Sequence, residues 1–329
     1  GSVLALVEDD SYLRQILSWP GRLRHVHIVG GSPCQGLSSV GMGRGFDDPR
    51  SALVWVVPVI RDIVVSIVPV SVGHLLENVK SMDDADRDAI SRIMGSSPQV
   101  VDAAEVAACS RPRLFWNSMG HIDVASDPVD ADEILEPGWR PVWELVRGSK
   151  NSFRTFLRPF EAGAPTECPE SFPRLPLSSY DARGLVYRPD SPKHQLDRVR
   201  AFISATAFAN RKSLRRVGSP ALRSRVAFAR WIHCQGGDEV VRPLSGDERD
   251  RALGFPSGAS LSHSWIEHQP VDIEFRRWEV TGNAFSPSVV AQLLQPLFQA
   301  VETRQPVPEA AQPPRLRSRE DVFAMLRSN

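Results

Sequence analysis

One cysteine of this chain lies in a setting that suits nucleophilic chemistry. Cys34 follows the apolar run His25–Val29 and lies within the Gly- and Ser-rich segment 30–39. A nucleophilic cysteine needs thiolate character, partial exposure and a mobile covering loop. Glycines recur in the next stretch, 36–48, which is typical of a loop that closes over a substrate. The alternative is that Cys34 is a small buried residue in a tight turn.

Two further charged groups could act as an acid and as an anion-binding pair. Glu77 follows the apolar run Val72–Leu76. A partly buried carboxyl group there can be held protonated and act as an acid. Arg111 and Arg113 precede another apolar run, and on an extended segment both would point to the same side. They could orient a carboxylate, a base or a phosphate. Taken singly, the favoured explanations are an N-capping or loop carboxylate for Glu77 and a solvated surface pair for the two arginines.

Short apolar runs alternate with helical stretches over the first 120 residues. Strands are predicted at Val3–Val7, His25–Val29, Val72–Leu76, Val100–Asp102 and Leu114–Trp116. Helices are predicted at Tyr12–Trp19, Ser51–Ile67 and Asp84–Met94. This alternation predicts an α/β sheet with mainly parallel strands. In such sheets the chemistry lies just past the carboxyl ends of the strands, where Cys34 and Glu77 are expected.

The second half of the chain differs in composition. Pro, Ser and Gly become frequent from about residue 137. The segment Arg198–Arg230 contains nine Lys or Arg residues and no Asp or Glu. Helices are predicted at Ser245–Leu253, beginning with a capping box, and from Ser286 or Ser288 to Phe298. Residues 301–316 are rich in Pro and Ala, as in a linker.

The composition excludes several classes of protein. Of 329 residues, 42% are hydrophobic and 24% charged, which argues against wholesale disorder. The 39 basic and 39 acidic side chains exclude a globally basic protein but not a local basic face. No apolar run reaches the roughly 18 residues of a membrane span, and the N-terminus lacks a secretory pattern. We therefore expect an intracellular protein without a membrane partner. Four separated cysteines without a CxxC pair predict no metal site.

The candidate motifs, taken together and in order, resemble those of DNA cytosine-5 methyltransferases. The motifs are Gly-Ser-Pro-Cys at 31–34, Glu-Asn-Val at 77–79, Arg-x-Arg at 111–113 and Gly-Asn-Ala at 282–284. Similarity to the animal-type de novo branch rests on segments 76–82, 88–92, 102–106, 111–117 and 248–256. Gln35 and the Gly-Asn-Ala motif are more similar to the maintenance and bacterial branches. The resemblance covers residues 3 to 298.

This resemblance implies methyl transfer from S-adenosyl-L-methionine to C5 of a cytosine flipped out of double-stranded DNA. Cys34 would add to C6 as a thiolate, and Glu77 would hydrogen-bond or protonate N3. Arg113 and Arg111 would brace the base and Glu77. The basic run would be the DNA-contacting face, with phosphate contacts expected from Arg211, Lys212, Arg215 and Arg216. The cofactor would be lined by Asp10, Pro33, Asn283 and Ala284.

The implied fold is an α/β, Rossmann-like sheet of the S-adenosylmethionine-dependent methyltransferases, with an inserted target-recognition region. We expect it to be N-terminally incomplete, because the family's opening strand and Phe-x-Gly-x-Gly-type turn have no counterpart in this sequence. The expected domains are a catalytic core with the Cys loop at 1–140, the recognition region at 141–244, a return to the core at 245–300 and a linker and tail at 301–329.

Three explanations of the missing turn remain open. The chain is a fragment of a longer enzyme, which we favour, or half of a split enzyme, or a non-catalytic relative that binds and stimulates an active methyltransferase. The last two imply an oligomer with another methyltransferase chain. Retention of Cys34, Glu77 and both arginines argues against long-standing loss of catalysis. A transfer-RNA methyltransferase also remains open, since a related branch uses the same catalytic residues. In a eukaryote the expected location is the nucleus.

Overall fold

The computed structural model divides the chain into two compact units. It describes residues 3–18, 23–38, 44–48, 50–145, 152–154, 184–206, 240–261 and 273–308. Unit 1 comprises residues 1–102, 112–125 and 289–329, and unit 2 comprises residues 103–111 and 126–288. The chain therefore crosses from one unit to the other four times.

Unit 1 is built on a four-stranded sheet with the strand order β1-β2-β5-β3. The strands are β1 His25–Gly31, β2 Ser71–Val79, β3 Gln99–Asp102 and β5 Pro112–Asn117. β1 and β2 are parallel, whereas β5 is antiparallel to both of its neighbours. Two of the three neighbouring pairs are therefore antiparallel, whereas mainly parallel pairing was predicted; β1, β2 and β3 run in one direction and β5 runs in the other. Residues 103–111 join β3 to β5, and a parallel crossover needs a dozen or more residues.

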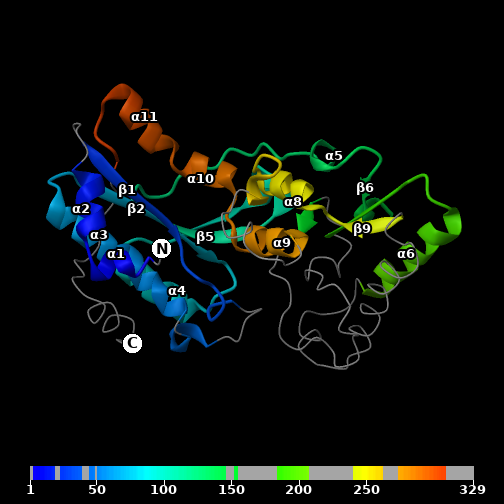
Figure 1. The fold of residues 1–329 in the computed structure, drawn as a ribbon, viewed down its shortest axis with the longest axis horizontal. Helices are drawn as coiled ribbons and strands as arrows, with labels where there is room; N and C mark the ends of the chain where they lie inside the picture. Colours follow the sequence, from blue (N-terminus) through cyan, green and yellow to red (C-terminus); the bar gives the residue numbers. More distant parts are fainter. Residues whose placement is uncertain are drawn as a thin grey trace. The chain divides into compact units, whose positions relative to one another are not determined.

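Helices α3 (Val56–Ile67) and α4 (Asp84–Met94) cover one face of this sheet (Figure 1). Their apolar side chains share one buried core with the strands. Trp116, fully buried, donates its indole N–H to Ser91 of α4 at 3.0 Å. Both helices confirm predictions, although the first is preceded by a 3-10 turn, η2 Ser51–Trp55.

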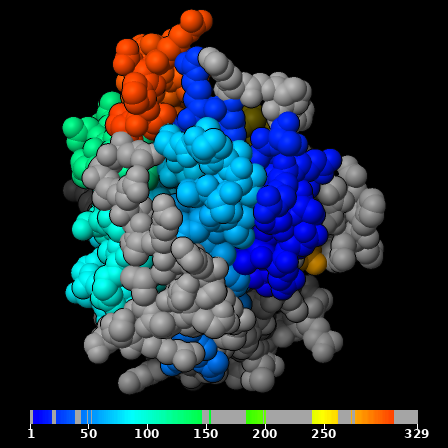
Figure 2. All heavy atoms as spheres, turned by 90° about the vertical axis from the view of Figure 1, so that its left-hand side faces the viewer, coloured from blue at the N-terminus to red at the C-terminus, as the bar shows by residue number. Residues whose placement is uncertain are grey.

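Two short helices at the N-terminus complete this side of unit 1. α1 (Ala5–Glu8) and α2 (Ser11–Leu17) pack against α3, and all three form part of one outer surface (Figure 2). The prediction of a strand at Val3–Val7 is thus wrong, because a run this short does not distinguish strand from helix by periodicity. In the helical form Leu4 and Val7, three residues apart, both reach the core.

Helices α10 (Pro287–Leu293) and α11 (Gln295–Thr303) follow at the C-terminal end. Asn117 of β5 donates its amide N–H to the carbonyl of Leu293, at the end of α10, at 3.2 Å. Since Trp116 points to α4, the next residue, Asn117, points to the opposite face of the sheet. One helix from residue 286 or 288 to 298 was expected, and the structure has two. Pro296 explains the break, since it has no N–H to continue the helix of α10. Helices on both faces of the sheet confirm the α/β class.

Unit 2 contains a three-stranded antiparallel sheet, a two-stranded sheet and several helices. The strands are β6 Arg140–Pro141, β8 Leu185–Tyr187 and β9 Val241–Pro243 in the first sheet, and β4 Cys109–Ser110 and β7 Phe153–Arg154 in the second. The helices are α5 Ala131–Ile134, α6 Lys193–Thr206, α8 Gly246–Leu253 and α9 Ile273–Asn283. Within the described ranges, no helix of either unit is long and apolar enough to cross a membrane.

Helix α8 begins with the predicted capping box. The Ser245 hydroxyl accepts the Glu248 backbone N–H at 3.3 Å, and the Glu248 carboxylate accepts the Ser245 backbone N–H at 2.8 Å. Glu248 is fully buried and also binds Arg242 at 2.6 Å. The segment 245–288 belongs to unit 2. The domain bounds expected from the sequence stay a prediction.

A pair of histidines lies at the amino end of β1, and a third lies on β2. His25 Nε2 is 3.2 Å from His27 Nδ1, and His25 Nδ1 is 2.7 Å from Ser71 Oγ. Burial, with the neighbouring His25, lowers the pKa of His27 to about 4. Burial, with the nearby Arg61, lowers the pKa of His74 to about 3. Both imidazoles are therefore neutral in the folded protein at pH 7.

We expect the free energy of unfolding to fall as the pH falls from 7 to 5. Unfolded histidines bind protons near their ordinary pKa of 6.5, whereas folded His27 and His74 do so near pH 4 and 3. Stability is therefore fully present above about pH 6.5 and is lost below it, by at most about 1.4 kcal/mol per pH unit for each histidine. Urea unfolding of the wild type and His74→Gln across this range measures the effect. Equal slopes in the two proteins would contradict it.

Candidate functional site

The carboxyl ends of β1 and β2 lie side by side in unit 1. In their parallel register Gly31, the last residue of β1, is opposite Glu77. The chain then turns through residues 32–38, which carry a partly exposed Cys34. The Cys34 carbonyl accepts the backbone N–H of Ser38 at 2.7 Å and so closes the turn. The structure thus places the start of the Cys34 turn beside Glu77, at the carboxyl ends of β1 and β2.

Glu77 lies within β2, not after it as the sequence suggested, because β5 pairs with β2 as far as Val79. Arg113 on β5 donates from Nε to Glu77 Oε1 at 2.8 Å. The two side chains are 14% and 11% exposed, so water weakens this ion pair little. The other oxygen, Oε2, lies over Gly31 at 3.1 Å from the position that a Cβ would take there. Glycine at this position therefore leaves room for the carboxylate.

Two polar residues of the predicted motifs, to which the sequence assigned no role, join the same strand ends. The buried Asn78 side chain donates from Nδ2 to the Ser32 hydroxyl at 2.7 Å. In the parallel register of β1 and β2, Gly31 is opposite Glu77, so the next residues, Ser32 and Asn78, are also neighbours. The pattern Gly-Ser in one strand end and Glu-Asn in the other is the signal that could have identified this pair.

The glycine-rich segment after Cys34 is anchored at both of its described ends. Gly45 donates its backbone N–H to the carbonyl of Gly36 at 3.2 Å. Gly36 packs so closely that a Cβ would lie 2.2 Å from Ser51 Oγ, and Gly45 has a φ of +56°. The expected covering loop, 36–48, thus has a fixed base, while residues 39–43 lie outside the described part of the chain.

The two arginines of the Arg-x-Arg motif have different partners. Arg113 binds Glu77 in unit 1, as described. Arg111 belongs to unit 2, where its buried guanidinium donates to the carbonyl of Gly282 at 3.2 Å. Gly282 is in the last turn of α9, where unsatisfied carbonyl groups favour a cation. Arg111 therefore holds the segment that leads into Asn283 and Ala284.

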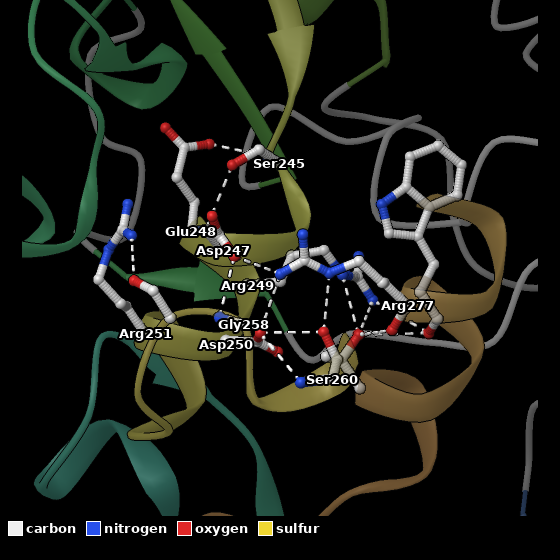
Figure 3. Close-up of polar contacts among 12 residues, drawn as sticks. Ser245, Asp247, Glu248, Arg249, Asp250, Arg251, Gly258, Ser260 and Arg277 are labelled. Carbon is white, nitrogen blue, oxygen red and sulfur yellow. Dashed lines mark hydrogen bonds and ion pairs between the residues drawn. The ribbon is translucent and has the colours of Figure 1, made fainter. Parts of the chain in front are cut away.

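An ionic network joins α8 to α9 within unit 2 (Figure 3). Arg277 of α9 binds Asp247 and, at 3.0 Å, the buried Asp250, both of α8. It also donates to the Ser260 hydroxyl at 2.8 Å. Its guanidinium lies against Gly246, where a Cβ would be 2.2 Å from Arg277 Cζ. These contacts fix α9, and with it the Gly-Asn-Ala segment, relative to α8.

The four residues expected at the cofactor are divided between the units. Asp10, in unit 1, is the N-cap residue of α2 and binds Arg14 at 2.7 Å, which lowers the pKa of Asp10. Pro33 lies in the Cys34 turn and is half-buried. In unit 2 Asn283 is exposed and Ala284 packs on an apolar cluster. Both carboxylate oxygens of Asp10 accept from Arg14, in a partly exposed ion pair at the start of α2.

The residues expected to contact DNA lie outside the described residues. Arg211, Lys212, Arg215 and Arg216 all fall within the segment 207–239. Among the residues that are described, no three His, Cys, Asp or Glu side chains are arranged to hold a metal ion.

Two aspartates that bind the same arginine should differ strongly in their effect on stability. The Asp250 side chain is 1% exposed and the Asp247 side chain is 42% exposed. We expect Asp250→Ala to reduce the free energy of unfolding by about 3 kcal/mol, because it leaves a buried charge poorly compensated. Asp247→Ala should cost at most about 1 kcal/mol. Urea denaturation of both variants measures this, and similar losses in the two would contradict it.

This chain is similar in structure to known methyltransferases, and part of its sequence matches a family model. Among solved structures, Entamoeba histolytica methyltransferase EhMeth is 13% identical with a TM-score of 0.48, over 92% of this chain and 88% of that chain. S. pombe Dnmt2 methyltransferase is 15% identical with a TM-score of 0.41, over 82% of this chain and 78% of that chain. The family model described as C-5 cytosine-specific DNA methylase matches residues 7–97, a segment that contains Cys34 and Glu77.

Proposed function

We propose that this chain is a DNA (cytosine-5-)-methyltransferase that forms a covalent adduct between Cys34 and cytosine. The arrangement at the ends of β1 and β2 carries the proposal. The Cys34 turn leaves β1 directly after Gly31, and Glu77 lies opposite Gly31 with its carboxylate held by Arg113 at 2.8 Å. The match of residues 7–97 to the family model supports the same chemistry. Within the family, the sequence motifs favour the animal-type de novo branch, located in the nucleus if the cell is eukaryotic.

The reaction requires a nucleophile because C5 of cytosine is itself poorly nucleophilic. The Cys34 thiolate forms a bond to C6, and the electrons of the C5–C6 double bond move to C5 and through the ring toward N3 and O2. C5 then takes the methyl group and loses its proton to a base. That electron pair restores the double bond as the thiolate departs. Partial exposure of Cys34 on a turn suits it to this attack.

Glu77 is proposed to stabilise the negative charge that develops at N3. Arg113 binds Oε1, which orients Oε2 toward the end of β1 and the turn that follows. In its protonated form this carboxyl group would donate a hydrogen bond to N3. That bond would be stronger in the adduct, where negative charge has built up on N3, and this difference lowers the barrier. Because both side chains are largely buried, the orientation is held without competition from water.

Double-stranded DNA is the substrate we propose, with the target cytosine flipped out of the stack. In a duplex, C6 is shielded by neighbouring bases and N3 is paired with guanine, so the thiol and the carboxyl group can reach these atoms only when the base is flipped out. The basic segment Arg198–Arg230 supplies positive charge for phosphate contacts in a chain whose net charge is zero.

S-adenosyl-L-methionine is the methyl donor we propose, and when bound it supplies an electrophilic methyl group. Asp10 and Pro33 of unit 1 and Asn283 and Ala284 of unit 2 are the candidate contacts. Asp10 also binds Arg14 in a partly exposed pair, so a polar group of the donor would compete with that guanidinium for the carboxylate. An oligomer with another methyltransferase chain is the partner we propose.

The adduct can be tested without a methyl donor. Once Cys34 is bonded to C6, C5 can take a proton from water, and reversal then releases the original hydrogen. We expect the protein to release tritium from DNA containing [5-³H]cytosine and Cys34→Ala to release none. Cys109→Ala is the matched control, because Cys109 is fully buried in unit 2. Release that persists in Cys34→Ala would refute Cys34 as the nucleophile. No release by the wild type, together with stimulation of an active methyltransferase, would instead favour the regulatory alternative.

Glu77, the proposed acid, should account for a large part of the rate of tritium release. We expect Glu77→Gln to slow tritium release by about 10²- to 10⁴-fold, because the amide cannot transfer a proton to N3. Arg113→Lys should slow it less, since a cation remains but the fixed geometry of the guanidinium is lost. Glu105→Gln, at an exposed residue of unit 2, is the control and should leave the rate unchanged. A wild-type rate for Glu77→Gln would contradict the assignment.

A further inference from the structure

We propose that Asn78 is a positioning residue that sets the place of Cys34 through a hydrogen bond to Ser32. The inference rests on the proposed function of Cys34 and extends it to residues that contact no substrate. Asn78 and Ser32 both belong to unit 1, and the Asn78 side chain is 1% exposed. A buried amide needs partners for its N–H and carbonyl groups, so its contacts are restrictive.

Both ends of the Asn78 amide are used. Oδ1 accepts the backbone N–H of Val79 at 2.7 Å. Nδ2 donates to Ser32 Oγ at 2.7 Å and lies 3.4 Å from the Ser32 carbonyl. The bond to Val79 fixes the orientation of the amide, so Nδ2 can point only to Ser32. The strand β2 thereby holds the first residue beyond β1 by its side chain.

Ser32 is well placed to control Cys34 because Pro33 separates them. The proline ring fixes φ of Pro33 near −65°, and it restricts Ser32 to extended conformations. Few torsion angles are therefore free to vary between Ser32, which is held by Asn78, and the Cys34 side chain. On its other side Cys34 is held through its carbonyl, which accepts the Ser38 N–H at 2.7 Å. We call the Asn78–Ser32 hydrogen bond the loop clamp.

The loop clamp also couples the thiol to the acid. Successive side chains of a strand point to opposite faces, so Glu77 and Asn78 leave β2 in opposite directions. Glu77 lies over Gly31 and is held by Arg113, while Asn78 holds Ser32. Adjacent residues of one strand thus set the positions of both reacting groups. The loop clamp therefore links the position of the thiol to the strand that carries the acid.

Loss of the loop clamp should affect the reaction more than substrate binding or folding. We expect Ser32→Ala to lower the maximal rate of tritium release about tenfold, because small displacements of a nucleophile cost large factors in rate. The DNA concentration for half-maximal rate and the thermal midpoint should stay close to those of the wild type. Ser32→Thr keeps the hydroxyl and should restore the rate.

A second measurement does not require the proposed reaction. Iodoacetamide alkylation of Cys34, followed by mass spectrometry of its peptide, should be several-fold faster in Ser32→Ala and in Asn78→Ala than in the wild type. The double variant should be no faster than the single ones, because all three lack the same bond. Cys109, fully buried in unit 2, is the internal control and should remain protected in every variant.

The outcomes separate the loop clamp from the proposed function. If the wild type releases no tritium, the proposed function fails, and alkylation still decides on the loop clamp. Unchanged alkylation of Cys34 in Ser32→Ala, or effects of Ser32→Ala and Asn78→Ala that multiply in the double variant, would overturn it. Faster alkylation of Cys109 as well would mean general loosening of the fold and would overturn it too. The loop clamp is supported if alkylation becomes faster at Cys34 but not at Cys109, and if the double variant reacts no faster than the single variants.

Discussion

The parallel register between β1 and β2 is the constraint on which the candidate site depends. It places Gly31 opposite Glu77, so the Cys34 turn, which follows Gly31, begins beside Glu77. Arg113 reaches Glu77 because β5 pairs with the other edge of β2, where it is antiparallel. Three strands that are distant in the sequence thus supply the nucleophile's turn, the acid and the cation that orients the acid. A slip of one residue between β1 and β2 would put the side chains of β1 on the opposite face and shift the Cys34 turn relative to Glu77.

Elements with strong local signals could be predicted from the sequence. Helix α4 has the bounds expected, and the capping box of α8 forms as its Ser-x-x-Glu spacing requires. The apolar run Val3–Val7 was misassigned because its state is decided by packing on α3, which no local pattern encodes. Strand direction was also out of reach, since it depends on how β3 is connected to β5.

The candidate site was predictable as a set of residue types but not as a set of contacts. Cys34, Glu77 and Arg113 stand out by their order along the chain. Ser32 and Asn78 lie in the same motifs, but their contact was not predicted because a serine and an asparagine near strand ends usually serve as turn or cap residues. The different partners of Arg111 and Arg113 were also hidden, since a shared side of an extended segment does not imply a shared partner.

Gly246 bears on how this protein could be engineered. Glycine in a helix is ordinarily about 1 kcal/mol less favourable than alanine, so this position looks like an easy gain in thermostability. Here the missing side chain is the space that the Arg277 guanidinium occupies. A substitution chosen from helix propensity would displace that cation from two carboxylates and would weaken the fold it was meant to strengthen. The residue at position 246 of α8 is thus determined by Arg277 of α9. A stability screen that scores each helix by its own propensities would wrongly replace the native glycine.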